Sequence, residues 1–214
     1  MPKSSTPSRE RIVAGAADMI SRRGLSATSI REMAKHAGAP LGSTYHYFPE
    51  GKQQLAAEAV RHTGDRVARS LATELAAGPA AGLDAFVALW RRIVVDTDFH
   101  AGCPVLAVAI EEPSAAEVSP ALAAAAEVSP ALAAAAEVSP ALAAAAEVFE
   151  QWEDLLAISL REHGAGAEQA AQIATLIVAS VEGTVAMCRA RRSTEPLDRT
   201  AVQLQTLIAT AIDG

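Results

Sequence analysis

Hydrophobic residues recur every three or four positions along most of this chain, which is the spacing of one face of an α-helix. In the first such segment Val13, Ala16 and Ile20 follow this spacing. Gly24 comes next, and glycine commonly ends a helix because it adopts a left-handed backbone without steric cost. The pattern predicts a first helix from about Ser8 to the residue before Gly24.

A second helix is predicted from a capping pattern. Ser29 and Glu32 are spaced so that the serine oxygen can accept a backbone N–H while the glutamate reaches back to the N–H of the serine. Apolar residues then recur at helical spacing from Ile30 until Gly38 ends the helix. Pro40 forces a tight turn after it.

The next short helix, over residues 41–48, is predicted to have a core face and a polar face. Leu41, Thr44 and Phe48 fall on the inward face. The outward face carries residues that are mostly polar and costly to bury, namely Gly42, Ser43, Tyr45, His46 and Tyr47. Two short helices joined by a sharp turn form a helix-turn-helix, whose second helix fits the major groove of B-DNA. The outward residues are therefore candidates to read DNA.

The rest of the chain continues the helical pattern. A long helix is predicted from Lys52 to about Leu75, and further helices are predicted over 83–98, 140–163, 167–191 and 197–212. Alanine is abundant and aromatic residues make up 4%, a composition that favours helices over sheets. We therefore predict an all-α fold, with an N-terminal three-helix domain at residues 1–52 and a helical remainder at residues 53–214.

A ten-residue unit, Glu-Val-Ser-Pro-Ala-Leu-Ala-Ala-Ala-Ala, occurs three times in succession over residues 117–146. Ten residues turn a helix by about 1000°, roughly 80° short of three turns, so successive copies do not share one face and a solenoid is not favoured. Each Ser-Pro pair suits a helix start, and we expect Ser139 and Pro140 to open the helix that runs to His163. The first two copies are interpreted as a recent tandem duplication or an error in the recorded sequence.

Charge is distributed unevenly, although the whole chain has a net charge of -7. Residues 1–62 hold nine of the 18 Lys and Arg residues and five of the 25 Asp and Glu residues, which leaves nine basic and 20 acidic residues for the remainder. A basic first part suits contact with nucleic acid even in an acidic protein, because one face does the binding.

The chemistry of an enzyme or a metalloprotein is not indicated. No phosphate-binding glycine loop, dinucleotide fingerprint, nucleophile elbow or zinc-protease motif occurs. Cys103 and Cys188 are far apart, and neither His46 nor His100 has partners at metal-ligand spacing. We expect no catalytic residue, no metal and no cofactor. We also expect a cytoplasmic protein, because residues 1–8 lack a secretion signal and no apolar segment approaches the length of a membrane span.

Residues 9–62 resemble the DNA-binding domain of TetR/AcrR-family transcriptional repressors. The resemblance is carried by the run Gly-Ser-Thr-Tyr-His-Tyr-Phe at 42–48, followed by Lys52. Phe99, the run Gly-Cys-Pro-Val at 102–105 and the later Glu111 are similar to the subgroup named after the LmrA and YxaF regulators. Members of that subgroup are expected to have one copy of the ten-residue unit, so the triple repeat is a departure.

The resemblance implies a ligand-responsive repressor that binds double-stranded DNA as a homodimer. The start of the second helix, Tyr47 and Lys52 would meet phosphates, whereas Ser43, Tyr45 and His46 would face base edges. Thr44 is counted with them although we expect it in the core. The predicted DNA-binding set is Thr28, Ser29, Ser43, Thr44, Tyr45, His46, Tyr47 and Lys52. An alternative places both tyrosines in the core of the small domain.

A ligand pocket is predicted between the helices of the remainder, because such pockets are usually apolar with a few polar anchors. Glu111, Glu182 or Arg91 could supply an anchor. The predicted ligand-binding set is Phe86, Trp90, Phe99, Cys103, Phe149, Trp152, Glu182 and Met187. A small apolar or aromatic inducer that prefers a dimer with its DNA-binding domains too far apart would release the operator.

The last two predicted helices are apolar around much of their circumference, which indicates that a partner subunit covers them. Arg189, Arg191 and Arg192 lie near a helix end, where the carbonyl groups favour positive charge. Two alternatives remain open: the first is a transcriptional activator, and the second is a helical interaction protein without ligand sensing.

Overall fold

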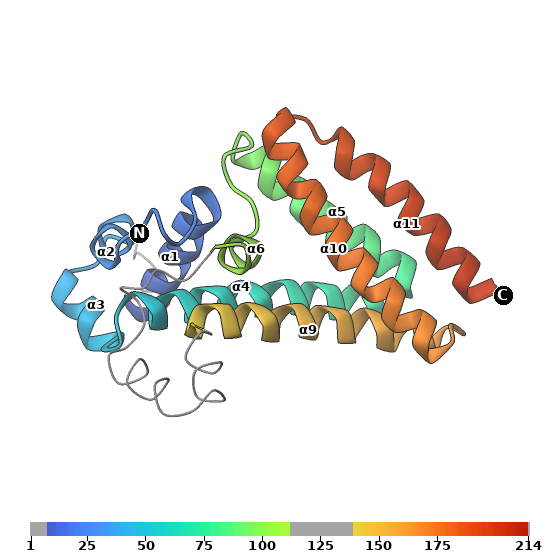
Figure 1. The fold of residues 1–214 in the computed structure, drawn as a ribbon, viewed down its shortest axis with the longest axis horizontal. Coiled ribbons are helices and arrows are strands. Elements are labelled where there is room, and N and C mark those ends of the chain that lie inside the picture. Colours follow the sequence, from blue (N-terminus) through green and yellow to red (C-terminus); the bar gives the residue numbers. More distant parts are fainter. Residues whose placement is uncertain (1–7, 112–138, 214) are drawn as a thin grey trace, which may run out of the picture. The chain divides into compact units, whose positions relative to one another are not determined.

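The structure is a computed structural model that describes residues 8–111 and 139–213. Every regular element within these two ranges is an α-helix, so the predicted all-α fold is confirmed. The helices, labelled in Figure 1, are α1 (Ser8–Arg23), α2 (Ile30–His36), α3 (Leu41–Tyr47), α4 (Lys52–Leu75), α5 (Pro79–Asp96), α6 (Pro104–Ala109), α9 (Pro140–Glu162), α10 (Ala167–Arg191) and α11 (Glu195–Asp213).

The chain divides into two compact units. The first unit comprises Met1–Thr63 and Pro104–Ala146, and the second comprises Gly64–Cys103 and Glu147–Gly214. Helices α1, α2, α3 and α6 therefore belong to the first unit, and α5, α10 and α11 belong to the second. Helices α4 and α9 contribute to both units. The domain boundary after residue 52 stays a prediction.

The first unit is built around α1, which packs against α2, α3 and α6. Its core consists of large apolar side chains that are almost completely buried, including Ile12, Ile20, Met33, Phe48 and Leu55. Burial of this apolar surface is the main source of stability for the unit. A Cβ atom on Gly15 would lie 3.0 Å from the Cβ of Ala37, so the glycine permits α1 to approach the end of α2 closely.

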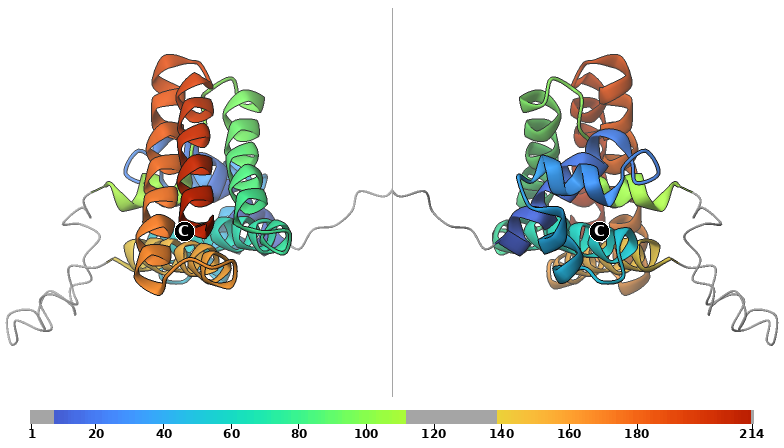
Figure 2. Two further views of the ribbon diagram at one scale, coloured as in Figure 1. Left: turned by 90° about the vertical axis from the view of Figure 1, so that its right-hand side faces the viewer. Right: turned by 90° about the vertical axis from the view of Figure 1, so that its left-hand side faces the viewer.

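The second unit contains three helices that lie side by side, α5, α10 and α11 (Figure 2), and each packs against the other two. Helix α5 begins at Pro79, earlier than the predicted start at residue 83, with Gly78 as its N-cap. Gly82, just before the predicted start, lies inside the helix. A Cβ atom on Gly82 would lie 2.2 Å from Cδ2 of Leu75, so this glycine serves close packing inside the helix.

Helix α9 begins where the third Ser-Pro pair predicts. Pro140 is its first residue, and the N–H of Leu142 donates to Oγ of Ser139 at 3.1 Å. This is the cap expected of serine before a proline at the first helical position. The first two copies of the ten-residue repeat, at 117–136, lie outside the described residues.

Two expectations about helices need correction. Helix α6 was not predicted, because six residues are too few to show a helical period. The expectation that no segment is long and apolar enough to cross a membrane was wrong for α10, which has a mean hydropathy of 1.5 over its most apolar 18 residues. Half of that stretch is buried inside the protein, and buried core helices pass the same test, so this is weak evidence for a membrane span.

Candidate functional site

Helix α3 has one buried face and one exposed face. Thr44 and the C-capping residue Phe48 are completely buried. Tyr45 is 50% exposed, Tyr47 is 36% exposed, and His46 between them is exposed as well. The alternative that places both tyrosines in the core is therefore wrong. Three hydrogen-bonding side chains stand next to one another on a short helix that a packed core holds from behind.

Three positions of α3 differ in detail from the expected faces. Leu41 and Ser43 are half-buried, so neither lies fully on the face assigned to it. The counting of Thr44 with the DNA-contacting residues is corrected, because its side chain has no exposed surface. Its hydroxyl group donates to the carbonyl of Pro40 at 3.2 Å, within the turn that precedes the helix. Thr44 therefore stabilises the turn with its hydroxyl group and packs in the core.

The start of α2 has the predicted capping box. The N–H of Glu32 donates to Oγ of Ser29 at 3.2 Å, and Oε2 of Glu32 accepts the N–H and the hydroxyl of Ser29 at 2.9 and 2.7 Å. The side-chain hydrogen bond from Ser29, its backbone N–H and the nearby charge of Arg23 lower the pKa of Glu32. Ser29 remains at the surface, and Lys52 is half-buried at the first position of α4.

Thr28 does not offer its hydroxyl group to solvent. The side chain is buried, and Oγ1 donates to the carbonyl of Leu25 at 2.8 Å. The hydroxyl group closes the turn between α1 and α2, so a phosphate contact at Thr28, which stays a prediction, would not use this hydroxyl.

Glu111, just after α6, holds the same turn from the other side. Its carboxylate accepts the N–H of Leu25 at 2.8 Å, and the N–H and hydroxyl of Ser26 at 2.6 Å each. Gly24 has a φ of +80°, and a Cβ atom there would lie 2.0 Å from Oε1 of Glu111. The carboxylate thus fixes the segment that leads directly into the cap of α2.

Sequence reasoning offered Glu111 as an anchor for a ligand and missed this role. The contact joins residues 85 and 86 positions apart in the chain, so no local pattern reveals it. Glu111 was noticed because it is part of the resemblance to the LmrA and YxaF regulators. Together with the packing of α6 on α1, the contact ties a distant segment to the helix-turn-helix.

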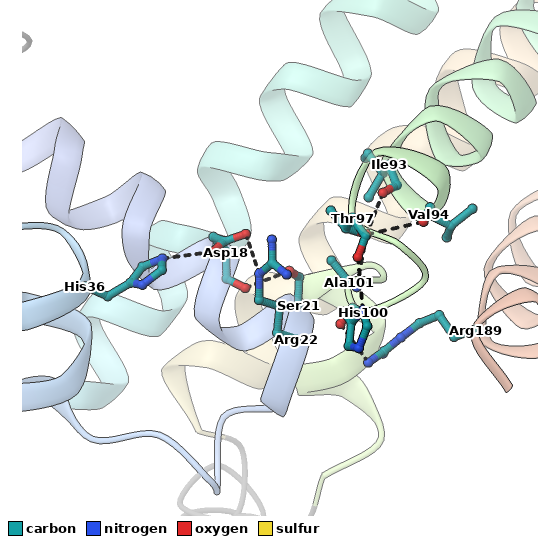
Figure 3. A network of polar contacts seen from close by, with 10 residues as sticks. All are labelled: Asp18, Ser21, Arg22, His36, Ile93, Val94, Thr97, His100, Ala101 and Arg189. Atoms are coloured by element: carbon teal, nitrogen blue, oxygen red, sulfur yellow. Dashed lines mark hydrogen bonds and ion pairs between the residues drawn. The ribbon is translucent and has the colours of Figure 1, made fainter. Parts of the chain in front are cut away.

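A basic hollow lies between the ends of α1 and α2. It has a volume of about 460 Å³ and is lined by Met19, Arg22, Arg23, Glu32, Lys35 and His36. Asp18 pairs with Nε of Arg22 at 2.9 Å and with Nε2 of His36 at 2.8 Å, as the left part of Figure 3 shows. Arg23 lies 3.9 Å from Glu32, and Lys35 adds a further positive charge to this surface, which begins at the capping box of α2 and suits an anionic partner.

Four of the predicted ligand-binding residues form one aromatic cluster in the second unit. The ring centroids of Trp152 lie 5.7 Å from Phe86, 5.9 Å from Phe149 and 6.3 Å from Trp90, all in tilted or edge-to-face geometry. Nε1 of Trp152 donates to the carbonyl of Gly64 at 3.1 Å. A Cβ atom on Gly64 would lie 2.4 Å from Val148, so glycine is required for this contact between α4 and α9.

Glu182 and Cys103, two further members of the predicted set, also come together. Glu182 is 2% exposed, and neither of its carboxyl oxygens accepts a hydrogen bond from an N–H or O–H group. Burial raises the pKa of Glu182 from 4.5 to about 8, and a hydrogen bond with the thiol of Cys103, which is a weak donor, opposes this shift. The indole N–H of Trp90 and the hydroxyl of Ser159 are buried without a partner as well.

Two predicted ligand-binding residues lie elsewhere. Met187 is 43% exposed on α10, because that helix buries Val185 and Cys188 on another face. Phe99 is half-buried and is covered by the guanidinium of Arg192, 5.8 Å from its ring centre. Arg91, offered as an anchor, lies at the surface and pairs with Asp198 at 3.1 Å.

The segment after α5 is held by the end of α10. Arg192, which caps α10 in the left-handed conformation, pairs with Asp98 at 2.7 Å, and Arg189 donates to the carbonyl of His100 at 3.2 Å. The right part of Figure 3 shows Arg189 reaching this segment. Asp98 and Phe99 also have positive φ values, and such strained residues persist only where surrounding contacts fix them. The basic cluster therefore secures a loop.

Within the described ranges, no group of three or more His, Cys, Asp or Glu side chains could hold a metal ion. Cys103 and Cys188 are both buried thiols, and burial raises the pKa of Cys188. The polar residues gathered at α3 are exposed, and those gathered around Glu182 are enclosed.

Two family models match the chain. The model for bacterial regulatory proteins of the tetR family matches residues 12–59. The model for the C-terminal domain of LmrA/YxaF-like transcriptional regulators matches residues 79–129 and 125–203. The two matched segments overlap inside the ten-residue repeat, so the repeat interrupts what would otherwise be one continuous match.

Relatives extend over nearly the whole chain. An uncharacterised HTH-type transcriptional regulator of Mycobacterium tuberculosis (strain ATCC 25618 / H37Rv) is 36% identical over 203 residues, which cover 94% of this chain and 93% of the relative. The HTH-type regulator YxaF of Bacillus subtilis (strain 168) is 30% identical over 203 residues, with 94% and 95% covered. LmrA of the same organism is 27% identical over 192 residues, with 89% and 90% covered.

Solved structures share the fold. A regulatory protein TetR from Rhodobacter sphaeroides superposes with a TM-score of 0.71 at 19% identity, with 94% of this chain and 99% of that chain covered. A TetR transcriptional regulator from Legionella pneumophila gives a TM-score of 0.69 at 18% identity, with 98% and 100% covered. At this level of identity, the likeness shows the helical architecture alone.

Proposed function

Because the chain belongs to the LmrA/YxaF-like group of the TetR family of bacterial transcriptional regulators, we propose that it is a repressor that binds a palindromic operator as a homodimer and leaves it when a small inducer binds. The inducer is small and apolar or aromatic. The protein acts in the cytoplasm, where its DNA lies. Neither a catalytic residue nor a cofactor takes part.

The observation that carries the proposal is the two-sided structure of α3. Tyr45, His46 and Tyr47 are exposed while Thr44 and Phe48 anchor the helix in the core. Hydroxyl and imidazole groups on a helix of this size can hydrogen-bond to base edges and phosphates in the major groove. We assign Ser43, Tyr45 and His46 to base edges, and Ser29, Tyr47 and Lys52 to phosphates.

A homodimer through α10 and α11 is supported by apolar side chains that the chain leaves at its surface. Leu176 and Met187 on α10 and Val202 on α11 are all strongly exposed. Apolar patches of this kind mark protein interfaces, and a second copy of the same two helices would bury them. Met187 then belongs to the dimer interface instead of the ligand pocket.

The ligand site that we propose is the enclosed region of the second unit. The aromatic cluster around Trp152 supplies apolar surface, and Glu182 with Cys103 supplies the polar anchor. A ligand that binds one dimer conformation better than the other shifts the population by no more than its difference in affinity.

The test is selection of bound sequences from a pool of random DNA duplexes. A palindromic sequence with two half-sites about one helical turn or a multiple of it apart should be enriched. Recovery of no sequence would refute DNA recognition and leave the helical interaction protein as the alternative. In vitro transcription from a promoter that carries the selected site then separates a repressor from an activator.

A further inference from the structure

Glu182 is a buried acid whose hydrogen-bonding capacity the fold does not satisfy. It lies on the face of α10 that also buries Val181 and Val185, and apart from the weak thiol donor of Cys103 neither carboxyl oxygen has a hydrogen-bond partner. Burying a carboxyl group without a partner costs free energy, and native proteins keep few such groups. A ligand that supplies the missing partner would recover this free energy when it binds.

A second unpaired group lies at the same level of the bundle. Asp98 and Arg192 pair at 2.7 Å beyond the C-terminal ends of α5 and α10, which run side by side in the same direction (Figures 1 and 2). Trp90 lies six residues before the last residue of α5, and Glu182 lies nine residues before the last residue of α10, which correspond to rises of roughly 9 and 14 Å along a helix. Trp90, whose indole N–H is also buried without a partner, therefore lies within about one helical turn of the level of Glu182.

Basic side chains near this level are engaged elsewhere. Arg189 donates to the carbonyl of His100, Arg192 pairs with Asp98, and Arg91 pairs with Asp198. The titratable group that acts directly on Glu182 is the thiol of Cys103. A positive charge for Glu182 therefore has to come from a bound molecule.

We propose that the inducer carries a protonated nitrogen that pairs with Glu182, with an apolar body packed against the aromatic cluster around Trp152. This inference rests on the ligand response proposed above and names the class of ligand. An ammonium group gains a charge-assisted hydrogen bond from the carboxylate, and the apolar body gains contact with the aromatic cluster.

Pairing with a cation requires Glu182 to lose its proton. Since burial raises the pKa of this group to about 8, about nine in ten molecules hold the neutral acid at pH 7. Binding of an amine should then release about 0.9 proton per site at pH 7. The affinity should rise about tenfold between pH 7 and pH 9, as long as the amine remains protonated.

The experiment uses 4-phenylbutylamine and its neutral counterpart 4-phenylbutan-1-ol as probes, with the full-length protein. Isothermal titration calorimetry in two buffers of different ionisation enthalpy gives the affinity and the protons released. We expect the amine to bind the natural protein at least about tenfold more tightly than the alcohol, because only the amine gains the charge pair. Glu182→Gln should remove this preference, and Glu168→Gln, at an exposed site on the same helix, should keep it.

Several results would overturn the inference: equal binding of the two probes, an amine preference that survives in Glu182→Gln, or no binding of either probe. Circular dichroism checks that the variant folds, and Glu182→Leu provides a second variant without a carboxyl group. DNA binding by the same ligand-free preparations is measured in parallel. Intact DNA binding without an amine preference contradicts this inference alone, whereas absence of DNA binding by the natural protein contradicts the proposed function.

Discussion

The two units of this protein differ in one buried carboxyl group. In the first unit, Asp18, Glu32 and Glu111 each accept hydrogen bonds that fix a helix end or a turn. In the second unit Asp98 and Asp198 pair with arginines in a similar way, but Glu182 is enclosed and accepts no hydrogen bond from an N–H or O–H group. The satisfied carboxylates of the first unit hold the backbone around the helix-turn-helix, and the proposed DNA contacts lie on its outer surface. A unit that encloses an unsatisfied acid is suited to receive a molecule from outside.

The largest effect is expected from removing the core support of the outer surface. Phe48→Ala deletes a completely buried ring and should cost about 3–5 kcal/mol of stability, together with DNA binding. Tyr45, which is 50% exposed on the same helix, provides the control, since Tyr45→Ala should change stability by less than about 0.5 kcal/mol and still weaken DNA binding. Urea denaturation at a fixed protein concentration measures the stability of both variants. Equal destabilisation by the two substitutions would contradict the two-sided structure of α3.

The pH dependence of stability isolates the enclosed acid. The pKa of Glu182 is about 8 in the folded protein, against 4.5 for the ordinary group. The tighter binding of this proton by the folded protein contributes stability that is fully present below pH 4.5 and is lost as pH rises through 8. Between these limits the natural protein should lose about 1.4 kcal/mol per pH unit relative to Glu182→Gln. Denaturation curves from pH 5 to pH 8 test this, and parallel pH profiles of the two proteins would refute the buried neutral acid.

The carboxylate that fixes the turn before α2 should matter for DNA binding without touching DNA. Glu111→Ala leaves the N–H groups of Leu25 and Ser26 without their partner and should cost about 1–2 kcal/mol. Affinity for the selected duplex should fall while its dependence on salt concentration stays the same, because no phosphate contact is lost. Glu10→Ala, at an exposed position of α1, is the control and should change neither. A flatter salt dependence for Glu111→Ala would contradict a positioning role.

The smallest effect is expected from a comparison of two tryptophan-to-phenylalanine substitutions, which remove the same volume. Trp152→Phe removes the hydrogen bond to the carbonyl of Gly64, whereas Trp90→Phe removes an N–H that has no partner. The first variant should be less stable than the second by about 1 kcal/mol. Thermal and urea denaturation of both variants gives this difference, and a value of zero would mean that the two indole groups are equivalent.

Local features of this fold were predictable from the sequence. The capping box at Ser29, the core positions Thr44 and Phe48, and the start of α9 at Pro140 follow from spacing within a few residues. These features are determined by interactions along a single helix or turn. The sequence therefore predicts the longer helices and the exposed face of α3, but not the short helix α6.

Features that depend on distant parts of the chain were not predictable. Glu111 meets the turn before α2 across more than 80 residues, and Gly64 is a glycine because Val148, 84 residues later, packs against it. Met187 follows the apolar pattern of α10 but lies at the surface, because the period of a helix does not say which apolar face its own chain covers. Tertiary packing decides each of these cases.

The most direct test of the central claim is the binding of two duplexes, the selected operator and an unrelated sequence, by the natural protein and by Tyr45→Ala. Fluorescence anisotropy at a fixed salt concentration gives the four affinities. Tyr45→Ala should lose about 1–3 kcal/mol on the operator and little on the unrelated duplex, because a base contact carries specificity. If the natural protein binds the two duplexes equally, or the variant keeps the full preference, the exposed face of α3 does not read DNA.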